Sequence, residues 1–171
     1  MTTFAAYARR VRDPERTIAE RWRALGGCIA GFKPYGYTAT WHKLADGRTL
    51  ATHRHGITHA ADLLDALDEL EAGRRVWQAA AGRYAARRGR EKAAGLRVPR
   101  RGDTFPEGIA YCPDPAVHPA GPLPEVLTRI FARHELGRPG CPNCGGTAVT
   151  RRLRTCTTCG IVVEKGDGTS G

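Results

Sequence analysis

The sequence predicts an α+β fold, in which N-terminal helices, a β-hairpin and a long helix are followed by a Pro-rich linker and a small cysteine-rich module. Three observations lead to this expectation. Apolar residues recur at helical spacing in three parts of the chain. Between the first and second parts, aromatic and β-branched residues alternate around an Asp-Gly pair. Four of the six cysteines lie in two close pairs near the C-terminal end.

The N-terminal region is expected to form two helices. Residues 3–11 place four apolar side chains on one face of a first helix. Asp13 is a suitable N-cap for the second helix, and Pro14 then takes the favoured first helical position. Apolar residues follow at i, i+4 and i+7, and Gly26 is a natural stop.

A β-hairpin is expected over residues 28–54, where runs of aromatic and β-branched residues flank Asp46-Gly47. An Asp-Gly pair favours a two-residue hairpin turn, because both turn positions must accept a positive φ. In this register Trp41 faces Thr52 across the sheet. A two-stranded sheet followed by a helix is similar in topology to the arm-binding domains of tyrosine recombinases.

A long helix is expected to begin at His59 and to continue past Tyr84, with apolar or small residues in near-heptad order. Gly73 lies in its middle and costs about 1 kcal/mol relative to Ala, so the helix is expected to bend or break there. Residues 61–72 contain five acidic side chains and no base, whereas residues 74–101 contain ten bases and one acid.

The region that follows is rich in proline, with seven of the eleven prolines between Pro99 and Pro124, so it is predicted to be a linker. A short amphipathic helix and the cysteine pairs come after it. The predicted segments are an N-terminal α+β domain (1–96), the linker (97–123), the short helix with the cysteine module (124–165) and a disordered tail (166–171).

The cysteine pairs lie in the segment CPNCGGTAVTRRLRTCTTCG, where Cys141 and Cys144 form one Cys-x-x-Cys turn and Cys156 and Cys159 form the other. Zinc prefers four tetrahedral ligands, and two such turns complete the set. A redox dithiol is the alternative, but it is typically a single pair at the start of a helix. A closed four-cysteine site is structural and does not catalyse.

This segment resembles the zinc-ribbon family, and CTTCGIVVEKG is similar to the second knuckle and following strand of transcription-factor ribbons of the initiation factor B type. The resemblance is confined to the C-terminal module and implies one structural Zn²⁺ held by the four cysteines. Ribbons of this kind use a strand surface to touch nucleic acid or a polymerase subunit. Arg152 and Arg154 occupy such positions here, although solvated charge explains them equally well.

The net charge is +10, with 27 Lys and Arg against 17 Asp and Glu, and a surface of this kind attracts polyanions. In the long helix, Arg83, Arg87 and Arg90 recur at i, i+4 and i+7, and Arg88 lies beside them. These four residues are the candidate phosphate contacts. The alternatives are an ordinary solvated face and a favourable alignment of bases with the helix dipole.

The sequence therefore predicts a zinc-ribbon-containing protein that binds nucleic acid, with DNA favoured, in transcription or in the life of a mobile element. A first alternative is an adaptor that docks on a polymerase or another protein partner. A second is a metal-dependent enzyme using His42, His53 and His55, which share one face of the expected hairpin. No apolar run suits a bilayer and no secretory signal is evident, so a cytoplasmic location without membrane association is expected.

Overall fold

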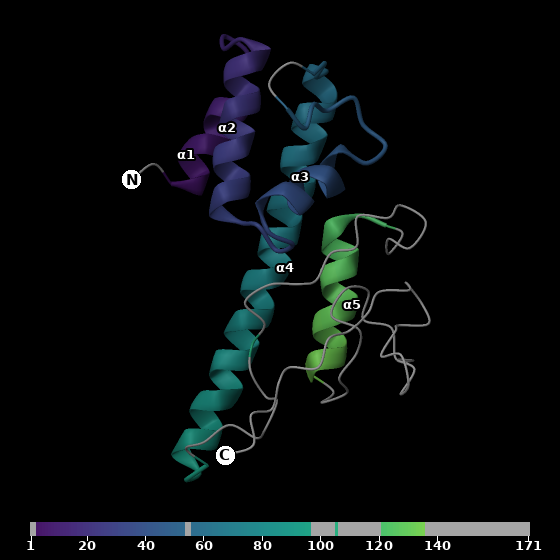
Figure 1. Cartoon of the computed structure of the whole chain (residues 1–171). Helices are drawn as coiled ribbons and strands as arrows, with labels where there is room; N and C mark the ends of the chain where they lie inside the picture. Colours follow the sequence, from purple (N-terminus) through teal and green to yellow (C-terminus); the bar gives the residue numbers. More distant parts are fainter. Residues whose placement is uncertain (1–2, 54–55, 97–104, 106–120, 136–171) are drawn as a thin grey trace, which may run out of the picture.

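The computed structural model describes residues 3–53, 56–96, 105 and 121–135. Within this part of the chain every regular element is an α-helix, arranged as in Figure 1. The elements are α1 (Phe4–Arg12), α2 (Ile18–Gly31), α3 (Tyr37–Ala45), α4 (Ala60–Ala93) and α5 (Leu123–Glu135). The expected α+β class is wrong for the described residues, which contain no strand and no sheet.

The longest helix, α4, forms the axis of the structure. Its 34 residues span roughly 50 Å at 1.5 Å per residue. Helices α1, α2 and α3 gather around its N-terminal part, and α5 runs beside its later turns (Figure 1). One hydrophobic core joins all five helices, and its fully buried side chains include Val11, Leu25, Leu44, Leu67 and Leu127. Among the described residues, no helix is both long and apolar enough to cross a membrane.

The expected hairpin is replaced by helices. Residues 28–31 complete α2, and α3 begins at Tyr37. Trp41 and Leu44 of α3 are buried in the core, which the helical spacing of their side chains permits. Gly47 does have a positive φ, 72°, but the turn follows the end of α3 and leads to no paired strand. The similarity in topology to recombinase arm-binding domains is therefore also wrong.

The start of α2 differs from the expectation as well. Thr17, rather than Asp13, is the N-cap: its hydroxyl oxygen accepts from the Glu20 N–H at 3.3 Å, and the Glu20 carboxylate accepts from the Thr17 N–H at 3.0 Å. The Thr17 hydroxyl also donates to the Glu20 carboxylate at 2.9 Å, and the hydrogen bonds that the carboxylate receives from the Thr17 N–H and hydroxyl lower the pKa of Glu20 below its ordinary value. Asp13 instead closes a turn before the helix, with its carboxylate accepting from the Glu15 N–H at 3.1 Å.

Helix α2 also continues beyond Gly26 and ends at Gly31. The two glycines in its middle face different helices. A Cβ added to Gly26 would lie 3.0 Å from the hydroxyl of Tyr37 in α3, and one added to Gly27 would lie 2.6 Å from the ring of Tyr7 in α1. Glycine is present for these close approaches between helices and not as a stop signal.

The expected break at Gly73 is absent, because α4 is continuous from Ala60 to Ala93. Gly73 is buried, and a Cβ added there would lie 2.8 Å from Cγ and Cδ2 of Leu123 in α5. Because Gly73 has no side chain, α5 can pack closely here, and its contacts with Leu123 and Leu127 offset the low helix propensity of glycine. Helix α5 thus belongs to the same core as the N-terminal helices. Most of the predicted linker and all of the predicted tail lie outside the described residues.

Candidate nucleic-acid interface

The charge of α4 is divided between its two halves. Residues 60–73 carry five acidic side chains and no base, and residues 74–93 carry seven bases with Glu91 as the single acid. The acids of the first half are largely engaged within the structure. The contacts are those of Arg12 with Asp68 at 2.5 Å and Glu71 at 2.8 Å, Arg48 with Glu69 at 2.7 Å, and the Thr49 N–H with Asp62 at 3.1 Å. The positive charge of α4 is therefore concentrated in its second half.

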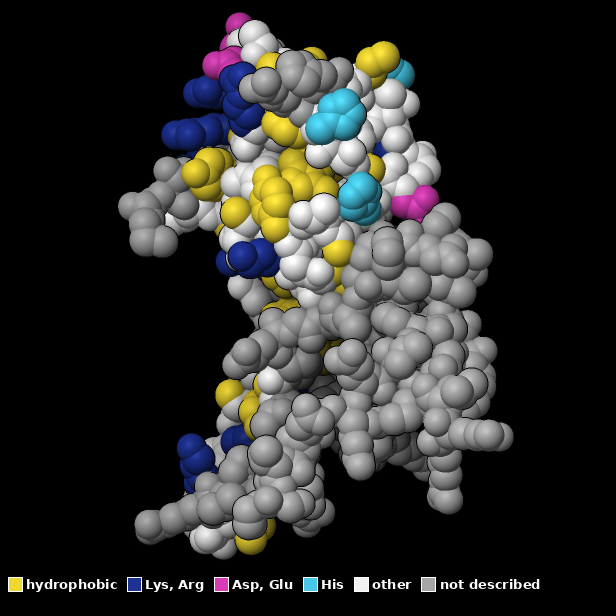
Figure 2. Space-filling view, viewed as in Figure 1, with side chains coloured by type: hydrophobic (Ala, Val, Ile, Leu, Met, Phe, Trp, Pro, Cys, Tyr) yellow, Lys and Arg dark blue, Asp and Glu magenta, His cyan; other side chains and the backbone are white. Residues whose placement is uncertain are grey.

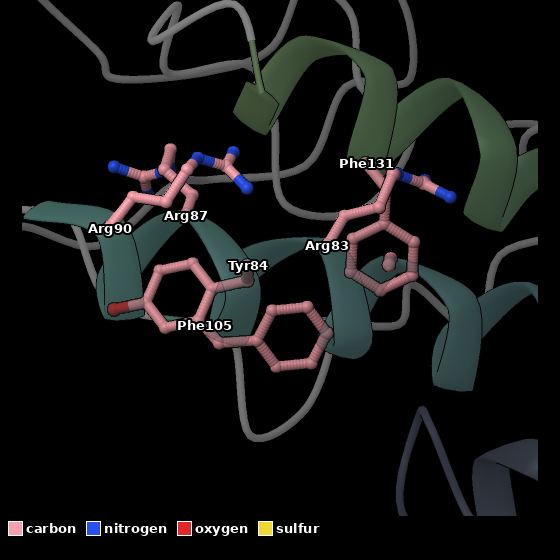
Figure 3. Close-up of a pocket in the computed structure, with 7 residues that line it drawn as sticks. Arg83, Tyr84, Arg87, Arg90, Phe105 and Phe131 are labelled. Atoms are coloured by element: carbon pink, nitrogen blue, oxygen red, sulfur yellow. The ribbon is translucent and has the colours of Figure 1, made fainter.

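Three of the predicted arginines lie along one side of this half of α4. Arg83 and Arg90 are exposed, and Arg87 is half-buried. The Arg87 guanidinium contacts the Glu91 carboxylate at 2.7 Å and lies 5.2 Å from the centre of the Tyr84 ring. Figure 3 shows Arg87 and Arg90 extending together from α4, with Arg83 nearer to α5. The structure thus brings three of the four predicted residues of this helix together.

Arg88 has a different environment. The residue is only 8% exposed, and its guanidinium donates to the Glu91 carboxylate and, at 3.4 Å, to the carbonyl of Leu96 just beyond the helix. Burial tends to raise the pKa of Glu91, but hydrogen bonds from Arg88 and Arg87 outweigh it and hold the pKa below its ordinary value. Arg88 therefore fastens the C-terminal end of α4 and does not belong to the exposed row.

A pocket of about 220 Å³ lies beside the exposed row, between α4 and α5. Its lining consists of Ala80, Arg83, Tyr84, Arg87, Arg90, Phe105 and Phe131. The rings of Phe105 and Phe131 are stacked, with centres 5.3 Å apart, and the Tyr84 ring lies 5.6 Å from that of Phe105. Figure 2 shows Lys and Arg side chains beside hydrophobic ones where α4 ends. The arrangement combines cationic groups with aromatic surface, which suits a ligand that carries both an anion and a flat ring.

The aromatic side of this pocket was not predicted from the sequence. From the sequence, Phe131 falls on the apolar face of the expected short amphipathic helix, and Tyr84 falls in the apolar stripe of the expected long helix. Phe105 lies between residues that the structure does not describe, in the Pro-rich stretch, where no periodic pattern marks it. Its contacts with Trp77 at 5.7 Å and with Phe131 show that it packs against the core.

The histidines do not form the expected cluster. Without a hairpin, His42 lies on the last turn of α3, His53 lies in the loop before α4, and His55 is outside the described residues. His53 lines a separate hollow of about 280 Å³ with Ile18 and Trp22. In the described part of the chain, no three His, Cys, Asp or Glu side chains come close enough to hold a metal ion. The shared face on which the enzyme alternative depended is therefore absent.

The predicted zinc ligands Cys141, Cys144, Cys156 and Cys159, together with Arg152 and Arg154, lie outside the described residues. The described cysteine, Cys28, is a free thiol buried between α1 and the core. Burial raises the pKa of this thiol to about 12, which keeps it protonated and unreactive at neutral pH.

Comparisons with known proteins add no relative: no family profile, no curated protein and no solved structure matches this chain.

Proposed function

We propose that this protein binds nucleic acid through the second half of α4, with a C-terminal zinc ribbon as a second contact. The observation that carries the proposal is the division of charge along one helix. Within the described residues, the acids of the first half are engaged mainly by Arg12, Arg48 and the backbone. Glu71 also lies 4.0 Å from Arg75 at the start of the second half, so the bases that these acids offset least are those beyond Arg75.

The chemistry of the exposed row supports phosphate binding. Guanidinium groups donate paired hydrogen bonds to phosphate and remain charged at any physiological pH. Arg83 and Arg90 each lie about one turn from Arg87, on either side of it along the helix, so successive phosphates of a strand can be met by successive side chains. Release of counterions from the nucleic acid then makes the affinity fall as salt rises.

The proposal for the ribbon depends on the spacing of the four cysteines and on their resemblance to zinc-ribbon knuckles. One Zn²⁺ bound by Cys141, Cys144, Cys156 and Cys159 would order a module too small to form a sufficient core of its own. Arg152 and Arg154 lie between the two knuckles in the sequence and would then add cationic surface to the module. A cytoplasmic location agrees with reduced, metal-binding cysteines.

The test is a titration of fluorescently labelled DNA and RNA oligonucleotides, single-stranded and duplex, at several salt concentrations. The variant Arg83→Gln/Arg90→Gln removes two exposed charges of the row. Its matched control is Arg9→Gln/Arg23→Gln, which removes two exposed charges from α1 and α2 and changes the net charge equally.

We expect wild-type binding to weaken as salt rises. Each lost phosphate contact lowers the slope of log affinity against log salt by about 0.7 on a single strand or about 0.9 on a duplex. The α4 variant, which loses two contacts, should therefore lower the slope by about 1.4 or about 1.8. The control variant should keep a slope close to that of the wild type. Equal salt slopes for the two variants would show that α4 is not part of the nucleic-acid interface. Absence of binding even at low salt would contradict the proposal and favour the adaptor.

A further inference from the structure

The pocket beside the arginine row has features that phosphate binding does not require. Phosphate contacts need only cationic groups, whereas here Arg83, Arg87 and Arg90 line a hollow together with aromatic residues. In Figure 3 the rings of Tyr84 and Phe105 lie next to each other beside α4. Both rings are half-buried, so each keeps part of its surface accessible.

The size of the pocket limits what it can hold. Pockets for drug-sized ligands and cofactors measure about 300–1,000 Å³. The volume here is about 220 Å³, which leaves room for one flat ring system and excludes a large cofactor. Phe131 is 2% exposed and forms the α5 side of the pocket, whereas Tyr84 and Phe105 are half-buried and keep part of their surface accessible to a ligand.

The lining chemistry favours a nucleobase. Bases stack on aromatic side chains and on guanidinium planes, and Arg87 already lies over the Tyr84 ring at 5.2 Å from its centre. Among the described residues that line the pocket there is no carboxylate to repel the phosphate attached to the base. Arg83 and Arg90 flank the pocket along α4, so a phosphate on either side of the inserted base meets a cation.

We infer that this pocket receives an unpaired nucleobase, which stacks beside Tyr84 and Phe105 while Arg83 and Arg90 hold the neighbouring phosphates. This inference rests on the proposed nucleic-acid binding and specifies its ligand as a single strand. In a duplex both faces of each base are covered by neighbouring bases, so a paired base cannot stack on a protein ring without leaving the helix. The same base-and-phosphate chemistry occurs in a free nucleotide, which the experiment distinguishes from a strand.

The experiment measures binding of the full-length protein to a labelled single strand, to a duplex of the same length and to a nucleoside monophosphate as competitor. Tyr84→Leu keeps apolar volume and removes the ring, while Tyr84→Phe keeps the ring. Tyr37→Leu removes an exposed tyrosine ring from α3 and is the matched control. Circular dichroism and the midpoint of thermal unfolding show whether each variant is folded.

We expect the single strand to bind more tightly than the duplex, and Tyr84→Leu to weaken single-strand binding by roughly 5- to 140-fold, the loss typical of one stacked base. Tyr84→Phe should restore the affinity, and Tyr37→Leu should leave it unchanged. A strand is the ligand if the monophosphate competes only at much higher concentration. If the monophosphate competes at equal concentration, the inference that the ligand is a single strand is wrong, and the pocket binds a free nucleotide.

The failure of this inference is distinguishable from the failure of the proposed function. If single strand and duplex bind equally and Tyr84→Leu behaves as wild type, while the salt slope still depends on Arg83 and Arg90, then base insertion is wrong and phosphate binding stands. If neither strand nor duplex binds, both are wrong. The wild-type comparison of single strand with duplex decides the inference even if Tyr84→Leu does not fold.

Discussion

Leu123, the first residue of α5, packs on Gly73 in the middle of α4, where a Cβ would lie only 2.8 Å from the Leu123 side chain. The same end of α5 is held by two hydrogen bonds, from the Leu123 N–H to the Glu69 carboxylate at 2.7 Å and from Lys43 to the Gly121 carbonyl at 2.9 Å. The start of α5 is therefore fixed to α3 and α4 at a position that requires glycine.

Replacing Gly73 by alanine is expected to destabilise the protein although alanine is the better helix former. The added methyl group collides with Cγ of Leu123, close to its backbone, and overpacking of this kind costs about 1–3 kcal/mol. The gain in helix propensity is about 1 kcal/mol, so the free energy of unfolding should fall by up to about 2 kcal/mol in urea denaturation.

Gly82→Ala provides the matched control, because Gly82 lies in the same helix, is exposed and has nothing within 4 Å of an added Cβ. Here propensity acts alone, and the free energy of unfolding should rise by about 0.5–1 kcal/mol. Stabilisation by both substitutions would contradict the packing of α5 on Gly73.

These glycines also show how far the sequence predicts the fold. Apolar stripes at helical spacing correctly locate α1, α4 and α5, because such stripes are long enough to be unambiguous. A single sequence does not reveal which glycine faces another helix, so the sequence around Gly73 predicts a bend or break that the packing of α5 prevents. The contact of Gly73 with another helix becomes visible only in the folded structure, where α5 packs on α4.

The prediction of a hairpin is wrong for a related reason. Tyr37 and Trp41 are spaced by four residues, which satisfies both strand alternation and one helical turn. Packing decides between the two: Trp41 is buried and stacks on Trp22 of α2 with ring centres 5.3 Å apart. Aromatic and β-branched residues favour strands only weakly against such tertiary contacts.

Part of the candidate site could be predicted from the sequence, and part could not. Helical spacing is a local property, and it correctly groups Arg83, Arg87 and Arg90. Burial of Arg88 and the arrival of Phe105 from a distant segment depend on tertiary structure, and no local pattern marks either.

The buried thiol of Cys28 predicts a dependence of stability on pH. Its pKa in the folded protein is about 12, whereas the pKa of an unfolded cysteine is about 8.5. Above about pH 8.5 the unfolded chain releases a proton that the folded chain retains, so this contribution to stability is complete below that pH and is lost as pH rises toward 12.

Cys28→Ala removes the titrating group and gives the comparison. The advantage of the wild type over this variant in free energy of unfolding should shrink by about 1.5–2 kcal/mol between pH 8 and pH 10. Urea denaturation at several pH values measures it. Parallel curves for the two proteins would show that Cys28 is not buried as a neutral thiol.

Arg12 joins α1 to α4, and its substitution tests the value of that link. Its hydrogen bond to Glu71 is the main cause that raises its pKa above the ordinary value, despite partial burial, with Asp68 adding to it. Because these side chains are partly exposed, we expect Arg12→Gln to cost at most about 1 kcal/mol, less at high salt.

Arg9→Gln is the control for this link, since Arg9 is exposed on the same helix. It should change the free energy of unfolding by no more than about 0.5 kcal/mol. Equal effects of the two substitutions in urea denaturation would show that the ion pairs of Arg12 do not hold α1 on α4.

Zinc removal is expected to affect the C-terminal module and to spare the helical core. The described core is formed by apolar side chains of α1 to α5, and no metal ligands cluster within the described residues. Mass spectrometry should find one zinc per chain, absent from the Cys141→Ser/Cys156→Ser variant. A chelator should leave most of the helical circular dichroism. Absence of zinc, or disulfides among the four cysteines, would contradict the proposed ribbon.

Arg88 and Arg90 are neighbours in sequence with opposite roles, which gives the last prediction. Arg88 is buried and donates to Glu91 and to the Leu96 carbonyl, so Arg88→Gln should loosen the end of α4 and speed hydrogen exchange of the amides near residues 90–96. Arg90 is exposed, so Arg90→Gln should leave that exchange unchanged and reduce the salt slope of single-strand binding by about 0.7. If Arg88→Gln weakened binding without speeding exchange, the prediction would be wrong, because Arg88 would then contact the nucleic acid and would not stabilise the end of α4.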